Sequence, residues 1–161
     1  MGPFALARQI GVSQGEARAF IQGYFERFPK IKGCLDAILE KARETGGTET
    51  LFGRVRPIVG LADRNHAVRA NAERMAMNAP FQGSAADLIK KAMPRLEEAL
   101  LAAAPSARLL LQVHDELVVE CDVQDAGRVG AIARAVMEGI AVLRVPLTVD
   151  VGTGPNWAEA K

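Results

Sequence analysis

The stretch Leu109-Leu-Leu-Gln-Val-His-Asp-Glu-Leu-Val-Val-Glu120 decides how the rest of the chain is interpreted. Two runs rich in Leu and Val flank a central His114-Asp115-Glu116, and each run has the length and composition of a strand. These features predict a β-hairpin with two carboxylates at its tip. The tip lacks the Asn-Gly or Asp-Gly that a relaxed two-residue turn prefers, which indicates that turn propensity alone did not select its residues.

The two carboxylates of the tip are candidate metal ligands. Adjacent carboxylates at the end of a rigid strand suit a hard cation, and Mg²⁺ is typically held by one or two protein carboxylates together with substrate phosphates. Asp115 and Glu116 fit that description. The alternative is an acidic turn that is simply solvated, and the composition of the hairpin by itself favours this alternative.

A row of polar residues precedes the hairpin. Residues 64–79 have helical composition, and Asn71, Arg74 and Asn78 are spaced by three and four, so they share one face. Gln82 continues the row if the chain resumes as a helix with a small kink after Pro80. Donors on such a face could contact the minor groove, where every base pair offers acceptors in nearly the same places. They would then sense the shape of a base pair without reading sequence; the alternative is an ordinary solvated face.

The remaining segments predict an α+β fold. Helices are expected over residues 4–10, 13–28, 31–45 and 81–103, the last with a kink at Pro94 and a surface ion pair between Asp87 and Lys90. A short hairpin is expected over residues 48–59, where Arg54 could contact phosphate. A helix over residues 124–140, capped by Asp122, and a strand over residues 145–151 would complete an antiparallel sheet packed by helices on one face.

Composition sets further bounds. The 161 residues are 49% hydrophobic, enough for a sizeable core, and 20 basic residues nearly balance 19 acidic ones, so any nucleic-acid surface must be local. Cys34 and Cys121 lack metal-ligand or redox spacing. Apolar runs stay well short of the ~20 residues of a membrane span, and the start lacks a signal-peptide pattern. We therefore expect a cytoplasmic location.

The hairpin sequence resembles a known motif. Gln112-Val113-His114-Asp115-Glu116-Leu117-Val118 is similar to the C motif of family A DNA polymerases, the DNA polymerase I type. Three further segments resemble that family in its order, and the similarity extends from about Phe4 to Trp157. These segments are Thr50-Leu51-Phe52-Gly53-Arg54, the run from Ala72 to Gly83, and Gly154-Pro155-Asn156-Trp157.

The resemblance implies a function and its residues. It implies that residues 1–63 are part of the fingers and residues 64–161 part of the palm of a DNA-directed DNA polymerase. Asp115 would be a direct Mg²⁺ ligand, Glu116 a weaker or indirect one, and His114 would touch the primer terminus. Primer–template DNA and deoxynucleoside triphosphates are the implied partners. The resemblance implies that Arg74, Asn78 and Gln82 contact the primer–template. Asn71, on the same helix face, and Arg54, on the short hairpin, are further candidate DNA contacts.

The family also has features that this chain lacks. Its A motif, with another metal-binding aspartate, and its nucleotide-binding fingers helix do not occur here, so the resemblance implies an incomplete polymerase domain that is inactive alone. An exposed sheet edge and apolar helix face would then favour self-association. Two alternatives stay open. One is a DNA-binding module without catalysis, and the other is a metal-dependent phosphohydrolase that uses Asp115, Glu116 and Asp150.

Overall fold

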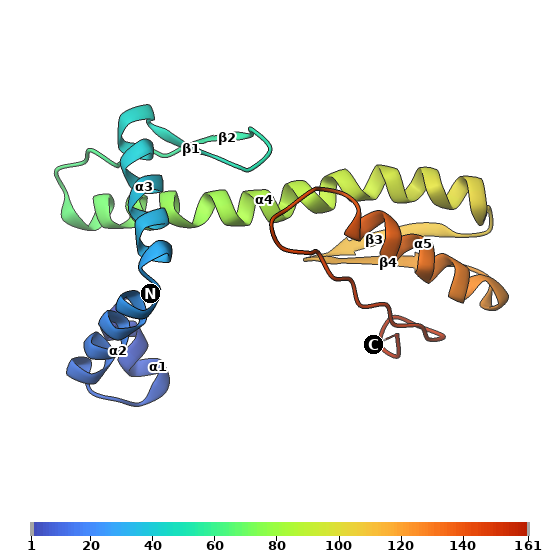
Figure 1. The fold of residues 1–161 in the computed structure, drawn as a ribbon, viewed down its shortest axis with the longest axis horizontal. Coiled ribbons are helices and arrows are strands. Elements are labelled where there is room, and N and C mark those ends of the chain that lie inside the picture. The colour runs from blue at the N-terminus through green and yellow to red at the C-terminus, as the bar shows by residue number, and fades with distance from the viewer. Residues whose placement is uncertain (1, 161) are drawn as a thin grey trace. The chain divides into compact units, whose positions relative to one another are not determined.

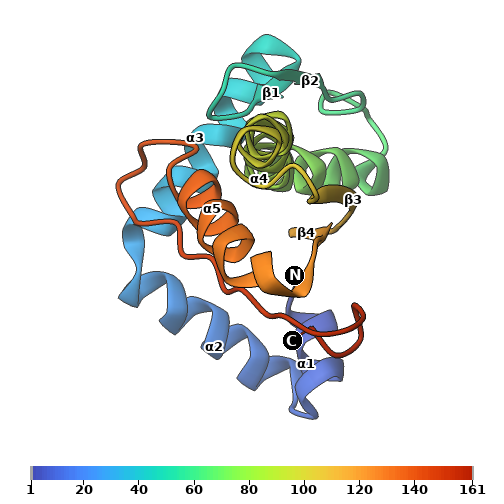
Figure 2. The same ribbon diagram turned by 90° about the vertical axis from the view of Figure 1, so that its right-hand side faces the viewer.

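The computed structural model describes residues 2–160, and its ribbon is shown in Figures 1 and 2. Helices alternate with two antiparallel strand pairs within these residues, as the predicted α+β class requires. In chain order the elements are α1 (Pro3–Ile10), α2 (Gln14–Arg27), α3 (Pro29–Thr45), β1 (Gly47–Glu49), β2 (Val55–Pro57), α4 (His66–Ala103), β3 (Arg108–Val113), β4 (Glu116–Glu120), the 3₁₀ helix η1 (Val123–Asp125) and α5 (Ala126–Glu138).

The chain forms two compact units. The first contains the residues up to Glu49 together with Val55–Pro80, and the second contains the loop Thr50–Arg54 together with the chain from Phe81 onward. Each unit has its own apolar core. Buried residues of the first core are Ala42, Ile58, Leu61, Ala72, Ala76 and Ala79; those of the second are Leu96, Leu100, Ala104, Ala107 and Val129.

Local signals set the helices of the first unit. The Ser13 side chain accepts from the Glu16 N–H (3.2 Å), and Glu16 Oε2 accepts from the Ser13 N–H (2.9 Å); these reciprocal bonds form a capping box at the start of α2. These bonds to Ser13 hold the pKa of the Glu16 carboxyl below its usual value. Gly46, at φ 74°, ends α3 in the left-handed conformation.

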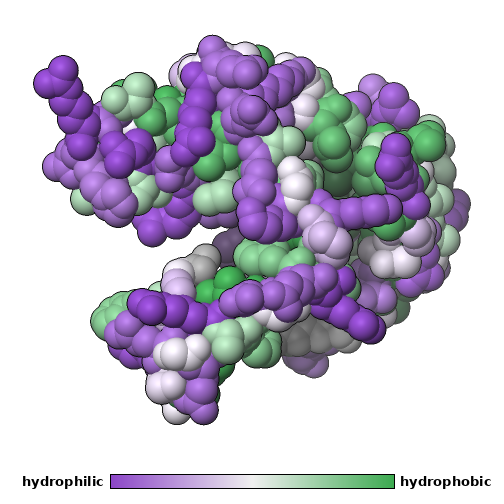
Figure 3. Space-filling view, turned by 60° about the vertical axis from the view of Figure 1, so that its left-hand side comes forward, coloured by the Kyte–Doolittle hydropathy of each residue, from purple (hydrophilic) through white to green (hydrophobic). Residues whose placement is uncertain are grey.

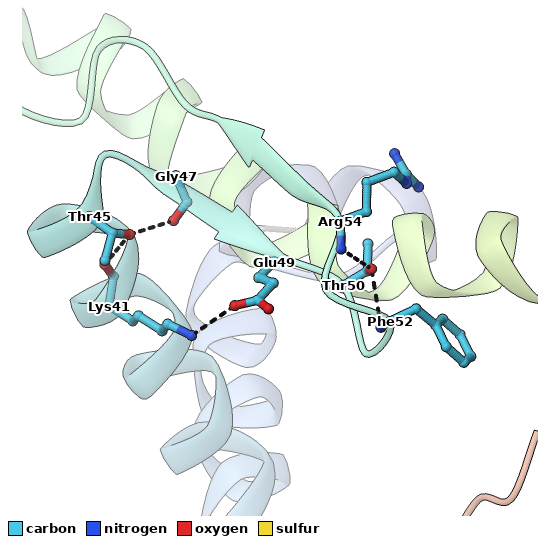
Figure 4. Close-up of polar contacts among 7 residues, drawn as sticks. All are labelled: Lys41, Thr45, Gly47, Glu49, Thr50, Phe52 and Arg54. Atoms are coloured by element: carbon cyan, nitrogen blue, oxygen red, sulfur yellow. Dashed lines mark hydrogen bonds and ion pairs between the residues drawn. The ribbon is translucent and has the colours of Figure 1, made fainter.

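The predicted short hairpin is confirmed as β1 and β2. Gly47 pairs with Pro57 and Glu49 with Val55. A side chain at Gly47 would place its Cβ 2.8 Å from the Arg56 carbonyl oxygen, so only glycine fits this strand start. Helix α3 is tied to the hairpin by Lys41, whose Nζ lies 3.3 Å from a Glu49 carboxylate oxygen, as Figure 4 shows.

Helix α4 differs from the prediction. We expected two helices broken at Pro80, but α4 is a single helix of 38 residues that continues through Pro80 and Pro94. A proline removes one backbone hydrogen bond and its ring crowds the preceding turn, at a cost of about 3 kcal/mol in a helix interior. Buried side chains on either side of each proline offset that cost, among them Ala76, Ala79, Ala92 and Leu96.

The C-terminal part of the second unit also differs. The predicted strand over residues 145–151 does not form, so the sheet there contains β3 and β4 within the described residues. Two side chains of α5 bond the backbone of Val149 in this segment. Arg134 Nε donates to the Val149 carbonyl (3.0 Å), and Glu138 Oε1 accepts from the Val149 N–H (3.0 Å). The 3₁₀ turn η1 precedes α5, and Asp122 makes no side-chain cap there.

The helices of the described residues do not meet the requirements of a membrane span. None of the helices within residues 2–160 combines the length and the apolar character needed to cross a membrane. Figure 3 shows hydrophilic side chains over much of the visible face, with smaller hydrophobic patches between them.

Candidate functional site

The predicted β-hairpin with a carboxylate tip is confirmed. Val113 pairs with Glu116, so His114 and Asp115 form a two-residue turn. His114 has φ 52°, the one positive φ among the described non-glycine residues. A positive φ at the first turn position is the pattern of a type II′ turn, where glycine is usual. The Gln112 side-chain amide donates to the His114 carbonyl oxygen (2.8 Å) and thereby fixes the peptide that leads into Asp115.

Asp115 also lines a cavity of about 220 Å³ in the second unit. The other lining residues that the structure describes carry no charge, so Asp115 is the charged group at its edge. They come from α4, from the end of α5 and from the segment that follows it: Leu88, Ile89, Ala92, Met137, Ile140, Leu147, Thr148 and Val149.

The tip fits one part of a Mg²⁺ site. Asp115 and Glu116 are adjacent and exposed, so their oxygens are accessible to an ion. Within residues 2–160 no group of three His, Cys, Asp or Glu side chains is placed to hold a metal. Mg²⁺ accepts a site with one or two protein carboxylates when water and phosphate supply the other ligands. The same finding removes the three-carboxylate set of Asp115, Glu116 and Asp150, because the fold does not group them.

The predicted polar row lies on α4. Asn71, Arg74 and Asn78 are exposed in the first unit, while Ala72, Ala76 and Ala79 of the same helix are buried. Arg74 Nη2 donates to Asn71 Oδ1 (2.6 Å), so these two side chains act together. Gln82 is exposed in the second unit. Their contact with DNA remains a prediction.

Arg54 is engaged within the chain. Its Nε donates to Asp87 Oδ1 (2.7 Å) and its Nη2 donates to the Gly83 carbonyl oxygen (3.0 Å). The expected ion pair between Asp87 and Lys90 is therefore wrong: Asp87 pairs with a residue 33 positions away. The predicted phosphate contact of Arg54 would have to use the remaining N–H groups of Nη1 and Nη2.

A buried polar cluster surrounds this ion pair. Thr50, Ser84 and Asp87 are all buried. The Thr50 hydroxyl oxygen accepts from the backbone N–H groups of Phe52 (3.3 Å) and Arg54 (3.1 Å), drawn in Figure 4. Hydrogen bonding by the Thr50 hydroxyl, aided by the Arg54 guanidinium, holds the pKa of the Asp87 carboxyl below its usual value, although burial opposes this shift. Sequence reasoning missed the cluster.

The chain is similar to known proteins along its length. The family model described as DNA polymerase family A matches residues 1–159. DNA polymerase I, thermostable, from Thermus aquaticus is 47% identical over 165 aligned residues, which cover 100% of this chain and 19% of that protein. DNA polymerase I from Streptococcus pneumoniae serotype 4 is 44% identical over 158 residues, covering 98% of this chain and 18% of that protein. The chain thus spans about a fifth of the length of these relatives.

A solved structure agrees with this similarity. The POL domain of Pol1 from M. smegmatis, in complex with DNA primer-template and dNTP, matches with a TM-score of 0.94 at 41% sequence identity. The match covers 99% of this chain and 28% of that chain. Backbone agreement over nearly all of the described residues means that the architecture above is that of one part of a larger domain.

Proposed function

Because the chain belongs to DNA polymerase family A, we propose that it supplies the part of a DNA-directed DNA polymerase that holds the primer end and the catalytic metal. The observation that carries this proposal is the carboxylate tip on a chain whose backbone matches a polymerase domain bound to primer-template and dNTP. The proposed partners are primer–template DNA, deoxynucleoside triphosphates and the rest of the polymerase domain. A second copy of the chain is a further candidate, since Leu110 and Leu111 of β3 are exposed.

We propose that residues 1–63 belong to the fingers and residues 64–161 to the palm. The hairpin with the acidic tip supports the palm assignment, because it presents two carboxylates at the end of a strand pair. The compact units divide the chain elsewhere, since the loop Thr50–Arg54 packs with the residues from Phe81 onward.

The proposed reaction is nucleotidyl transfer. The primer 3′ hydroxyl attacks the α-phosphorus of a deoxynucleoside triphosphate, and pyrophosphate leaves. Mg²⁺, when bound, supplies positive charge that acidifies the hydroxyl and stabilises the phosphate oxygens. Asp115 would hold that ion directly from the turn, and Glu116 would assist from the first position of β4. His114 lies next to Asp115 and contacts the primer terminus through its ring.

The exposed α4 residues have a separate role in this proposal. Arg74, Asn78 and Gln82 donate to the minor-groove acceptors near the primer end, and Asn71 orients Arg74 through their 2.6 Å bond. Because these acceptors lie in nearly the same place in every base pair, the contacts favour Watson–Crick shape over any sequence. We propose that the chain alone does not extend a primer, because it lacks the A motif with its metal-binding aspartate and the nucleotide-binding fingers helix.

The experiment uses a chimera in which this chain replaces the matching segment of the Thermus aquaticus polymerase. Asp115→Asn keeps size and removes charge, so nucleotide addition should collapse while primer–template binding stays nearly intact, because phosphate contacts dominate affinity. Arg74→Ala should lower the preference for paired over mispaired primer ends, with a smaller loss of rate. The discrimination lost should be about 1–3 kcal/mol at most.

Two control variants match these changes. Glu120→Gln alters an exposed carboxylate at the other end of β4, and Arg95→Ala alters an exposed arginine of α4; both should extend normally. Normal primer extension by Asp115→Asn in Mg²⁺ would show that Asp115 is not the metal ligand and that the tip is an ordinary acidic turn. A chimera that binds primer–template but extends nothing would favour the DNA-binding module instead.

A further inference from the structure

The loop Thr50–Arg54, called the 50–54 clip below, is docked along one side of α4 in the second unit. The Leu51 N–H donates to Ser84 Oγ (2.9 Å), and the Arg54 side chain reaches both Gly83 and Asp87. The Lys91 ammonium lies 4.2 Å from the centre of the Phe52 ring, within the range of a cation–π contact. Residues 83, 87 and 91 are four apart, so the clip follows a single helix face for two turns.

The docking depends on a glycine. A Cβ built at Gly83 would lie 2.6 Å from Thr50 Cγ2 and 3.3 Å from Arg54 Nη2. Thr50 is buried and its hydroxyl is bound to the loop backbone, so its methyl group has little room to move. Any larger residue at position 83 would push the clip away from α4.

The clip fixes the residue that follows Gln82. Arg54 Nη2 donates to the carbonyl oxygen of Gly83, the next residue in the chain, while the Gln82 side chain remains exposed. The clip therefore adds a hydrogen bond to the α4 backbone one residue after Gln82 and leaves the Gln82 side chain exposed.

We propose that Arg54 is a positioning residue that sets where Gln82 lies, and that it acts on primer-end discrimination through Gln82 and not by contact with DNA. This inference rests on the proposed function, since it assigns Gln82 to the primer–template. Arg54 is suited to this role because a guanidinium donates in two directions from one rigid plane, which a lysine ammonium on a flexible stem does not reproduce.

The test uses the same chimera and separates position from charge. Arg54→Lys keeps the charge but not the planar fork, and Arg54→Gln loses both. If Arg54 positions Gln82, both variants should lose discrimination to a similar extent, and neither should lose more than Gln82→Ala, for which we expect a loss between about 5-fold and 150-fold. A phosphate contact would instead survive in Arg54→Lys.

Two further measurements sharpen the result. Combining Arg54→Gln with Gln82→Ala should cost no more discrimination than Gln82→Ala alone, because residues that act as a unit are not additive. A plot of the logarithm of the DNA-binding constant against the logarithm of the salt concentration should have the same slope for Arg54→Gln and the unaltered chimera. Loss of one phosphate contact would instead reduce the magnitude of that slope by about 0.9. Arg128→Gln is the control, since Arg128 forms another Arg–Asp pair, with Asp125, at 3.0 Å.

The outcomes are distinguishable. A reduced salt slope, full activity of Arg54→Lys, or additive losses with Gln82→Ala would each overturn the positioning role while leaving the proposed function in place. A merely structural role would lower the melting temperature and slow extension of paired and mispaired ends alike, which would also overturn it. A chimera that extends no primer, or a Gln82→Ala variant with unchanged discrimination, would refute the proposed function and this inference with it.

Discussion

Replacing Gly83 with Ala tests the docking of the 50–54 clip on the free chain. Glycine in a helix interior is about 0.8–1.0 kcal/mol less favourable than alanine, so the substitution stabilises a helix wherever space is open. At Gly83 the added Cβ would meet Thr50 Cγ2 at 2.6 Å, closer than carbon atoms approach without displacement. Overpacking of this kind typically costs about 1–3 kcal/mol. The net change should therefore lie between about zero and 2 kcal/mol of destabilisation.

A matched control is available in α3. Gly33 is also a helix-interior glycine, but a Cβ there meets nothing within 4 Å, so Gly33→Ala should stabilise the chain by about 1 kcal/mol. The same chemical change thus has opposite expected signs at the two positions. A third variant identifies the clash: Thr50→Ser removes Cγ2 but keeps the hydroxyl that binds Phe52 and Arg54, so Gly83→Ala should be better tolerated in the Thr50→Ser background.

The assay is urea unfolding followed by far-ultraviolet circular dichroism, with thermal melts in parallel. For a chain of this size, 1 kcal/mol corresponds to about 2–4 °C in melting temperature. The reasoning is refuted if Gly83→Ala stabilises the chain as much as Gly33→Ala does. It is equally refuted if Thr50→Ser leaves the effect of Gly83→Ala unchanged, because the clash with the Thr50 methyl group would then not be its cause.

Three other predictions concern pH, the hairpin tip and association. The folded-state pKa of Asp87 is lowered, so the stability that its ionised form contributes is fully present above its unfolded pKa of about 3.9 and is lost as pH falls through the lower folded value. The free energies of unfolding of the chain and of Asp87→Asn should consequently differ at pH 7 and converge as the pH falls through the lowered folded-state pKa; a constant difference would contradict this. Gln112→Leu should destabilise the hairpin by about 0.5–1 kcal/mol through loss of its bond to the His114 carbonyl, and an unchanged melt would show that the bond is dispensable. Sedimentation should detect self-association at high concentration because Leu110 and Leu111 are exposed on a two-stranded sheet; a monomer at all concentrations would disprove it.

Features that depend on neighbouring residues were predictable. The C-terminal end of α3, the strand pair β3 and β4, and the tip at Asp115 and Glu116 all follow from short-range patterns of apolar residues, glycine and proline. The continuity of α4 was not predictable in the same way, because rules based on neighbouring residues predict that a proline such as Pro80 ends a helix. Burial on both sides of each proline is a tertiary effect that is not visible in a local window.

Strand formation at residues 145–151 failed for a related reason. The alternation of apolar and polar residues predicts an extended conformation, but pairing requires a neighbouring strand. Here Arg134 and Glu138, one helical turn apart on α5, bind the carbonyl and N–H of Val149. Their side chains satisfy both backbone groups of Val149, and sequence alone does not reveal such long-range partners.

Candidate ion pairs were also beyond local reasoning. Asp87 has Lys90 three residues away, and the helical spacing favoured that pair, whereas the structure pairs Asp87 with Arg54 across 33 positions. The sequence does not distinguish a hairpin arginine that binds phosphate from one that forms hydrogen bonds to a neighbouring helix. What separates the two roles is the small residue at Gly83, which admits the loop, together with buried polar partners at Thr50 and Ser84.

The hairpin tip shows why a strained residue can persist beside a proposed metal ligand. A left-handed conformation costs a non-glycine residue about 1–2 kcal/mol, and His114 adopts it at φ 52°. Glycine would relieve that cost but would increase the backbone freedom of the turn, whose His114 carbonyl oxygen accepts from the Gln112 side chain. A carboxylate that must meet an ion in a fixed place gains from a rigid turn more than from a relaxed one. The absence of an Asn-Gly or Asp-Gly turn at this position is therefore consistent with the proposed role of Asp115.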